Sequence, residues 1–439
     1  MRLHRDARPP VRIAHLGLGG FFRAHQAWYT GAAPDAADWG IAAFTGRSRT
    51  LADELSAQGG LYTLVTRGPD SDEMSVQTAV SAAHPGTDLD AWCTYLARPQ
   101  VAVVTLTVTE AAYRHHRDGG LDLDDPDVRA DADAVRRGGD PTTVPGRLVA
   151  GLAARRTAGA GPLAVVSCDN LPGNGEIAAH VVRDLARSVD PGLSDWIAGE
   201  VSFVTTMVDR ITPRTTPEDV RAVAERTGLQ DAVPVVTEPF TEWVLSGDFP
   251  AGRPAWDAAG ARFVADITAH EMRKLLLLNG GHSLLAYAGS ARGHDTIAEA
   301  MGDSVCRGWL EQWWEEASRY VPLPAAELTE YRAALVARFG NPRIRHRLAQ
   351  IAADGSHKVP IRVLTVLRGE RAAGRIPAGA VRILAAWIDH LRGVGAPVDD
   401  AGAAPYQDRA GSVREVLALL APDLGGDTDL IAAIDKALR

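Results

Sequence analysis

Short apolar runs alternate with helix-like stretches over roughly the first 260 residues of the chain. Continuous apolar or threonine-rich runs suit the strands of a mostly parallel sheet that is covered on both faces. Strands separated by helical patterns indicate βαβ units. The pattern predicts strands at Val11–Leu16, Gly40–Phe44, Val101–Val108, Leu163–Ser167, Ser202–Met207 and Val233–Val236.

The pattern changes at about Asp266. Strand-like runs largely disappear there, and Ala/Leu/Arg-rich helical segments continue to Arg439. We therefore predict an α/β domain with a mostly parallel sheet over residues 1–262 and an all-helical C-terminal domain over residues 263–439. The Gly/Pro-dense stretch Pro250–Gly260 is interpreted as a connector, and residues 118–145, rich in Asp, Gly and Pro, as a surface excursion.

Composition excludes several classes of protein. With 439 residues, two domains are expected. A net charge of −9 argues against a nucleic-acid partner, which needs a basic face, and no stretch approaches the roughly 18 apolar residues of a membrane helix. Cys93, Cys168 and Cys306 are too far apart in sequence to suggest a metal-spaced pair or a disulfide framework. We therefore expect a cytoplasmic protein with neither a nucleic-acid nor a membrane partner.

A glycine-rich turn follows the first predicted strand. The segment Gly17-Leu18-Gly19-Gly20-Phe21-Phe22-Arg23 has the glycines of a tight turn that lets a pyrophosphate approach the backbone, and a helix N-terminus follows. Phe22 stands where the third glycine of Gly-x-Gly-x-x-Gly is usual, so the motif alone is weak. Its place after the first strand of an α/β domain favours a dinucleotide site. The predicted cofactor-binding residues are Gly17, Gly19, Gly20, Phe22, Arg23 and Arg47.

The end of the second strand leaves the cofactor open between NAD and NADP. NAD enzymes often carry a carboxylate there for the ribose hydroxyls. This chain reads Thr45-Gly46-Arg47-Ser48-Arg49, with no carboxylate before Asp53. Arginine at this place can accommodate a 2′-phosphate, although ordinary surface charge is the alternative reading.

Ile267–Ala288 is predicted to be one buried helix, because it is apolar nearly all round. It contains Lys274, one of only three lysines in a chain that otherwise uses arginine. At about 100° per residue, Glu271 lies near 60°, His282 near 80° and Asn279 near 140° from that lysine, within one broad arc. Burial lowers the pKa of a lysine, which would make Lys274 a base for a carbinol proton. A structural polar cluster is the alternative.

Gly280 and Gly281 interrupt the same helix. Each glycine costs about 1 kcal/mol relative to alanine inside a helix. We therefore expect another group to approach closely at this pair.

The chain resembles the polyol-specific long-chain dehydrogenases, which include mannitol 2-dehydrogenase and fructuronate reductase (D-mannonate oxidoreductase). The resemblance covers nearly the whole length, and its most specific mark is Lys-x4-Asn-x2-His at Lys274, Asn279 and His282. Further matches are the glycine-turn segment continued to His25, Thr105–Glu110, Ser167–Asn170 with Asn174-Gly175, Met207–Pro213 and Asp354–Lys358.

The resemblance implies a Rossmann-type domain joined to a helical domain, a substrate held between the two, NAD or NADP as cofactor and no metal. It implies Lys274 as general base, Asn170 and Asn279 as the pair that stabilises the developing oxyanion, and Glu271 as proton relay. It also implies contacts to substrate hydroxyls or a carboxylate from Asp209, His282 and Lys358. A small-molecule sugar alcohol, ketose or hexuronate is therefore the expected partner, and the family is compatible with a monomer or a weak homo-oligomer.

One position bears on the substrate. Mannitol 2-dehydrogenases commonly carry an arginine eight residues before Lys358, where this chain has Gln350. The pattern Gln-Ile-Ala-x-Asp-Gly resembles the fructuronate reductase branch instead. Arginines at Arg345, Arg347 and Arg362 would then be available for a substrate carboxylate, and Gln350 and Arg362 are predicted as substrate-binding residues.

Three other functions remain as alternatives. A mannitol-1-phosphate 5-dehydrogenase-like enzyme needs a phosphate cradle, which no sequence feature marks. A decarboxylating hydroxyacid dehydrogenase also carries a lysine followed by asparagine on a buried helix. A dinucleotide sensor without turnover would not need the lysine, the asparagines, the aspartate and the histidine together.

Overall fold

The computed structural model describes residues 3–46, 48–116 and 119–438. The chain divides into two compact units, Met1–Ile267 and Thr268–Arg439. The first is α/β and the second is helical, so the predicted fold class is confirmed. The predicted boundary between residues 262 and 263 falls within the short strand β11 (Arg262–Phe263), the last strand of the first unit.

An eight-stranded sheet forms the centre of the first unit, in the order β11-β10-β8-β7-β6-β1-β2-β5. Neighbouring strands are parallel except for β10 against β8. The carboxyl ends of β1, β6 and β7 therefore meet at one edge, where α/β proteins bind their ligands. The bounds are β1 Val11–Leu16, β2 Gly40–Phe44, β5 Val80–His84, β6 Val103–Leu106, β7 Leu163–Ser167, β8 Val201–Asp209 and β10 Glu242–Ser246.

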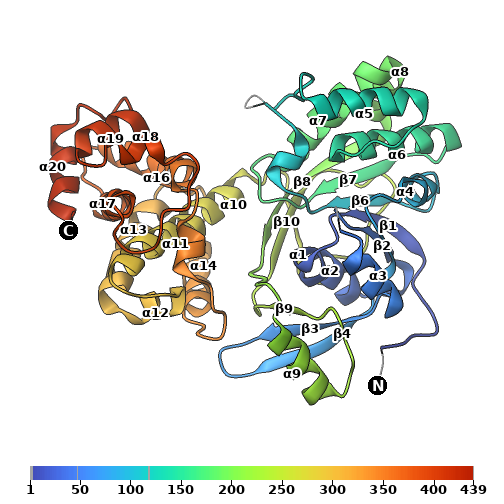
Figure 1. Ribbon diagram of the computed structural model, residues 1–439, viewed down its shortest axis with the longest axis horizontal. Coiled ribbons are helices and arrows are strands. Elements are labelled where there is room, and N and C mark those ends of the chain that lie inside the picture. Colours follow the sequence, from blue (N-terminus) through green and yellow to red (C-terminus); the bar gives the residue numbers. More distant parts are fainter. Residues whose placement is uncertain (1–2, 47, 117–118, 439) are drawn as a thin grey trace. The chain divides into compact units, whose positions relative to one another are not determined.

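Helices cover both faces of this sheet because alternate residues of each strand point to opposite sides. On β1, Ile13 packs with Phe22 and Leu55 on one face. Ala14 and Leu16 pack on the other face with helices α4 to α8, which Figure 1 shows together on one side. The bounds are α1 Gly20–Ala24, α2 Gln26–Ala32, α3 Thr50–Ala57, α4 Leu89–Leu96, α5 Pro126–Arg137, α6 Val144–Ala158, α7 Asn174–Val189 and α8 Pro191–Glu200.

A second sheet of three strands was not expected. Its order is β4-β3-β9, with β3 at Tyr62–Arg67, β4 at Asp72–Gln77 and β9 at Val235–Thr237, and helix α9 spans Pro217–Thr227. The run predicted at Val233–Val236 is therefore a strand of this small sheet and pairs with β3, not with the main sheet. Five strands of the unit, β3, β4, β5, β10 and β11, were not predicted; all contain polar residues, which weaken the apolar signal.

The interpretation of residues 118–145 as a surface excursion is wrong for most of its described length. Helix α5 occupies Pro126–Arg137: Asp125 caps its N-terminus and Gly138 ends it with φ of 68°. The buried Asp131 carboxylate accepts backbone N–H bonds from Thr142 (2.8 Å) and Thr143 (2.7 Å), which fixes the turn into α6. The Asp, Pro and Gly residues are the caps and turns of helices, and for that reason they resembled a loop.

The second unit contains helices and no named strand among its described residues. Its central element is the predicted helix, which runs without a break from Thr268 to Gly289 through α10 (Thr268–Arg273), η3 (Lys274–Asn279), α11 (Gly280–Leu284) and η4 (Leu285–Gly289). No helix in the described part of the chain is long and apolar enough to cross a membrane. The others are α12 Ile297–Gly302, α13 Ser304–Ser318, α14 Ala325–Phe339, α15 Leu348–Ala352, α16 Gly355–Ala372, α17 Ala378–Leu391, α18 Ala404–Gln407, α19 Val413–Leu420 and α20 Thr428–Ala437.

Candidate functional site

The glycine turn after β1 is built so that only glycine fits its first position. Gly17 has φ of +112°, and its N–H and that of Leu18 both donate to Phe44 O, at 2.9 and 2.8 Å. Thr107 Oγ1 donates to Gly17 O at 2.8 Å. A Cβ on Gly17 would lie 2.0 Å from Thr107 O. The turn is thus clamped between the ends of β2 and β6.

The next two glycines leave open space instead. A Cβ on Gly19 would meet nothing closer than Gly17 O at 3.5 Å, and one on Gly20 only Thr212 Cγ2 at 3.6 Å. Gly19 precedes α1, which begins at Gly20. This open backbone at a strand-to-helix turn fits the pyrophosphate of a dinucleotide, which needs close approach to main-chain N–H groups.

Phe22 and Arg23 support the turn from behind. The Phe22 ring is buried and stacks on His15, with ring centroids 3.6 Å apart. The Arg23 guanidinium is also buried and donates to Gly19 O at 3.1 Å and to Val233 O. The Phe22 ring is thus committed to packing and the Arg23 guanidinium to backbone carbonyls, so neither is proposed as a direct cofactor contact.

An ion pair lies just after the end of β2, where the choice between NAD and NADP is usually made. Arg49 Nε lies 2.8 Å from Asp53 Oδ2, on the exposed first turn of α3. A 2′-phosphate would have to compete with this carboxylate for Arg49. Arg47, the predicted cofactor-binding arginine, lies outside the described residues.

A buried acid stands beside Asn170 at the end of β7. Asp169 accepts hydrogen bonds from Val108 N–H, from the Tyr113 hydroxyl and from Ser167 Oγ (3.1 Å). Burial raises the pKa of Asp169 to about 7, although these three donors act in the opposite direction. Asn170 itself is exposed. Tyr113 was not singled out because it lies in a stretch without a clear pattern, and Asp169 was part of the matched segment Ser167–Asn170 but was given no role of its own.

Asn174 ties the loop that carries Asn170 to the neighbouring strand. Its side-chain amide donates to Asp169 O (2.9 Å) and Thr206 O (2.8 Å) and accepts from Thr206 N–H (3.0 Å). The other predicted site residue of this unit, Asp209, is the last residue of β8 and is buried, opposite Glu242 of β10. Both Asn170 and Asp209 thus lie at strand ends whose backbone is fixed by hydrogen bonds.

The helix that carries Lys274 departs from the predicted winding. Residues 274–279 form a π-helical turn with hydrogen bonds between residues five apart, and Gly280 N–H donates to Leu275 O. The arc of 100° per residue is therefore wrong across this turn. In an α-helix, Lys274 and Asn279 would lie about 140° apart around the axis. With i→i+5 bonding each turn holds more residues, so this separation is much smaller and the two residues come closer to one face of the helix.

Lys274 and Asn279 are both half-buried, whereas His282 is fully enclosed. The close approach expected at Gly280 and Gly281 is confirmed. A Cβ on Gly280 would lie 2.6 Å from the Trp313 indole, and one on Gly281 would lie 2.9 Å from Leu310 Cδ1.

His282 has basic surroundings. Its ring stacks on Phe339 (centroids 4.5 Å apart) and meets His346 edge-on at 5.2 Å, and its Nε2 is buried without a hydrogen-bond partner. Burial lowers the pKa of His282 well below its usual value, and His346, Arg362, Arg338 and Lys274 lower it further. The imidazole is therefore neutral at physiological pH, with an unused polar atom. His346 was missed because no motif or periodicity singled it out.

The remaining predicted residues of the helical unit differ in exposure. Lys358 Nζ donates to Ala353 O at 2.6 Å, at the end of α15. Arg362, on α16, donates to Ser283 Oγ (3.0 Å) and Asn279 O (3.3 Å), so its side chain contacts the helix that carries Lys274. Gln350 is exposed, as are Arg345 and Arg347. Glu271 is half-buried, one turn before Lys274.

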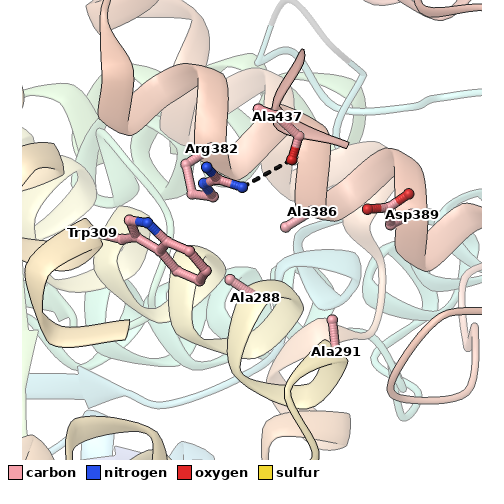
Figure 2. A pocket seen from close by; sticks show the side chains of 7 residues that line it. All are labelled: Ala288, Ala291, Trp309, Arg382, Ala386, Asp389 and Ala437. Carbon is pink, nitrogen blue, oxygen red and sulfur yellow. Dashed lines mark hydrogen bonds between the residues drawn. The ribbon is translucent and has the colours of Figure 1, made fainter. Parts of the chain in front are cut away.

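The helical unit also contains a small cavity and a cluster of possible metal-ligand side chains. A small cavity lies between Trp309, Arg382 and Asp389 (Figure 2), and its volume of about 10 Å³ accommodates roughly one water molecule. His294, Asp303 and Cys306 place possible metal-ligand atoms within 4.8 Å of one another. However, Arg292 Nε lies 2.5 Å from Asp303 Oδ2, so that carboxylate is already neutralised by a fixed cation.

Comparison with known proteins agrees with this architecture over nearly the whole chain. Residues 11–258 match the mannitol dehydrogenase Rossmann domain, and residues 266–436 match the mannitol dehydrogenase C-terminal domain. D-mannonate oxidoreductase of Escherichia coli K12 is 37% identical over 457 residues, covering 99% of this chain and 93% of that protein. Mannitol 2-dehydrogenase of Cereibacter sphaeroides is 36% identical, covering 96% of this chain and 91% of that protein.

A solved structure shows the same fold. The Pseudomonas fluorescens mannitol 2-dehydrogenase ternary complex with NAD and D-mannitol superimposes with a TM-score of 0.82 at 34% identity, covering 98% of this chain and 91% of that one. Both family domains, these relatives and the glycine turn followed by the Lys274 helix lead to one assignment. The chain belongs to the mannitol dehydrogenase family.

Proposed function

We propose that this protein is an oxidoreductase that transfers a hydride between a nicotinamide dinucleotide and a secondary carbinol of a linear sugar alcohol or sugar acid. The observation that carries the proposal is the π-turn at 274–279, which brings Lys274 and Asn279 closer to one face of the helix, and the buried His282 follows three residues later. Relatives named D-mannonate oxidoreductase and mannitol 2-dehydrogenase support it.

In the oxidation direction, Lys274 accepts the carbinol proton, and in reduction it returns that proton to the oxygen. A bound nicotinamide dinucleotide accepts the hydride in oxidation and supplies it in reduction. Asn279, on the same helix face, donates a hydrogen bond to the oxygen as negative charge develops there. Asn170 has the matching role in the first unit, and Glu271 exchanges the proton of Lys274 with water.

The open turn at Gly17, Gly19 and Gly20 holds the pyrophosphate of the dinucleotide. NAD or NADP is the proposed cofactor, and a 2′-phosphate would have to compete with Asp53 for Arg49. No metal is needed in the proposed reaction. The proton is proposed to move through the Lys274 amine, and the charge that develops on the oxygen to be met by the Asn170 and Asn279 amides, so the proposed reaction assigns no step to a metal. Treatment with EDTA should therefore leave turnover unchanged.

Among the possible substrates we favour a sugar acid. The unpartnered His282 Nε2 lies among cationic side chains, and Arg362 is fixed against the Lys274 helix by Ser283 Oγ. Such surroundings favour a carboxylate. Asp209 and Lys358 bind substrate hydroxyls, and Gln350 takes the place of the arginine usual in mannitol 2-dehydrogenases.

The test has two steps. First, nicotinamide absorbance is followed with D-fructuronate, D-fructose and fructose 6-phosphate, each with NADH and NADPH. Preference for fructuronate supports the sugar-acid proposal, preference for fructose overturns it, and preference for the phosphate returns the mannitol-1-phosphate alternative. Binding of a dinucleotide without turnover of any substrate would favour a sensor.

Second, variants separate the roles. Lys274→Ala should lower kcat about 10²–10⁴-fold while dinucleotide binding persists; retention of more than about a tenth of kcat contradicts the general base. Arg362→Ala should raise KM for fructuronate about 10-fold or more and change KM for fructose far less. The matched control is Arg368→Ala on the same helix, an exposed arginine paired with Asp423. Equal effects of Arg362→Ala on both substrates would overturn the carboxylate role.

A further inference from the structure

Two consecutive tryptophans of α13 contact the turn that carries Lys274 and Asn279. Trp313 Nε1 donates to Leu276 O and Trp314 Nε1 donates to Leu277 O, both at 2.9 Å. Both indoles are buried. Indole N–H groups inside a protein need an acceptor, and main-chain carbonyls inside an ordinary α-helix are already occupied by their own helix.

The Leu276 carbonyl is available because of the π-turn. Gly280 N–H donates to Leu275 O, five residues earlier, and to Leu277 O. It skips Leu276 O, which would be its partner four residues earlier in an α-helix. That skipped carbonyl is the acceptor of Trp313. The indole thus takes the place of the main-chain donor that the wider turn has moved away.

The two glycines make room for the indoles. A Cβ on Gly280 would lie 2.7 Å from Trp313 Nε1, and one on Gly281 would lie 3.2 Å from Trp314 Nε1. Any larger residue at position 280 would push Trp313 off Leu276 O. Paired glycines, paired tryptophans and paired leucine carbonyls therefore form one arrangement, which we name the indole clamp (Leu276, Leu277, Gly280, Gly281, Trp313 and Trp314).

We propose that Trp313 and Trp314 are positioning residues, whose indole N–H groups keep the π-turn open and so keep Lys274 and Asn279 on one face of the helix. Without these donors, Leu276 O regains Gly280 N–H as its partner and the turn tightens to α. Lys274 and Asn279 then diverge by about 140° around the axis, and no longer address one substrate oxygen together. The proposal rests on Lys274 acting as the base.

The test removes the indole N–H and keeps a ring. We expect Trp313→Phe and Trp314→Phe each to lower kcat about 10-fold or more and to shift the pH profile of kcat, with little change in the Kd of the dinucleotide. Trp309→Phe, on the same helix, is the matched control, because the Trp309 ring packs under the Arg382 guanidinium, at 4.4 Å. It should leave kcat and its pH profile unchanged.

A double-mutant cycle with Lys274→Ala separates this proposal from the function on which it rests. In the Lys274→Ala background, Trp313→Phe should lower the residual kcat clearly less than it lowers the wild-type kcat, because one of the two groups that it positions is gone. If Lys274→Ala keeps its turnover, the proposed function itself fails. If Lys274→Ala is inactive but the tryptophan variants lose only thermal stability, with kcat and pH profile intact, the clamp is merely structural and the proposal is overturned.

A second substitution guards against misfolding, since Phe leaves a gap beside the helix. Benzothienylalanine at position 313 keeps the volume of the indole and replaces the N–H by sulfur, so only the hydrogen bond is lost. It should reproduce the fall in kcat that Trp313→Phe causes. Wild-type kcat in this variant would show that ring packing, not the hydrogen bond, matters, and would overturn the proposal.

Discussion

The buried Asp169 should make the stability of the first unit fall as pH rises. Its pKa is raised to about 7 by burial, whereas an unfolded aspartate titrates near 3.9. Between these values the native state holds a proton that the unfolded state has released. Stability therefore decreases with each step of pH across this window and levels off above pH 7. Asp169→Asn removes this titration and keeps the size of the side chain.

The magnitude follows from the shift. About three pH units at 1.36 kcal/mol each give a change of about 4 kcal/mol in the free energy of unfolding between pH 4 and pH 8. For a domain of this size, 1 kcal/mol corresponds to about 2–4 °C in Tm. The Tm of the wild type relative to Asp169→Asn should therefore fall by roughly 10 °C over that range.

Differential scanning calorimetry of the full chain measures this difference at several pH values. The transition of the first unit is the one that moves to higher temperature when a dinucleotide is added. Asp190→Asn is the control, because the exposed Asp190 carboxylate pairs with Arg156, which lowers its pKa. A Tm difference between wild type and Asp169→Asn that stays flat from pH 5 to pH 8 would refute the reasoning. It would mean that the donors from Tyr113 and Val108 outweigh burial and keep Asp169 ionised.

Two further predictions concern the first unit. Burial lowers the pKa of His15 to about 3, so below about pH 6.5 the unfolded state binds a proton that the native state does not. The free energy of unfolding of the wild type, relative to His15→Gln, should therefore fall by up to about 1.4 kcal/mol per pH unit as the pH drops from 6.5. A calorimetric difference that stays flat between pH 4.5 and 7 would contradict this. Arg155 is buried and donates to five main-chain carbonyls. In urea unfolding, Arg155→Met should lower the free energy of unfolding by about 3–5 kcal/mol, and Arg155→Lys should lower it less. A loss below about 1 kcal/mol in Arg155→Met would show that these carbonyls find other donors.

The buried parallel strands were predictable because a strand covered on both faces must be apolar at every position. Val11–Leu16, Gly40–Phe44 and Leu163–Ser167 begin and end as the sequence indicated. The strand Asp72–Gln77 was not, because it lies at the edge of a small sheet with one side in water, and its residues are mostly polar. Strands of this kind have their pairing determined by tertiary contacts that a local pattern does not contain.

Part of the candidate site could also be predicted from local sequence. A turn that requires glycine, as at Gly17, is recognisable from the glycine itself, and a motif such as Lys-x4-Asn-x2-His is recognisable from its spacing. The partner that a charged side chain binds in the folded protein cannot be predicted from its local sequence. Arg23 and Arg49 look equally suited to a phosphate, yet one is spent on backbone carbonyls and the other on Asp53. Two arginines that the sequence offers for the same cofactor thus acquire different roles from the partners that the fold gives them.

The spacing of Lys274 and Asn279 contains information that the α-helix assumption hides. Five residues put two side chains on different sides of an α-helix and on the same side of a π-turn. A pair at this spacing that must contact one substrate oxygen therefore requires the wider turn. The wider turn in turn requires a donor for Leu276 O, the carbonyl that it leaves without a main-chain partner. Gly280-Gly281 and Trp313-Trp314 are the sequence marks of that requirement, separated by 33 positions. The glycine pair therefore has a structural reason: it admits the indoles that keep the turn wide, and the wide turn sets the position of Lys274 relative to Asn279.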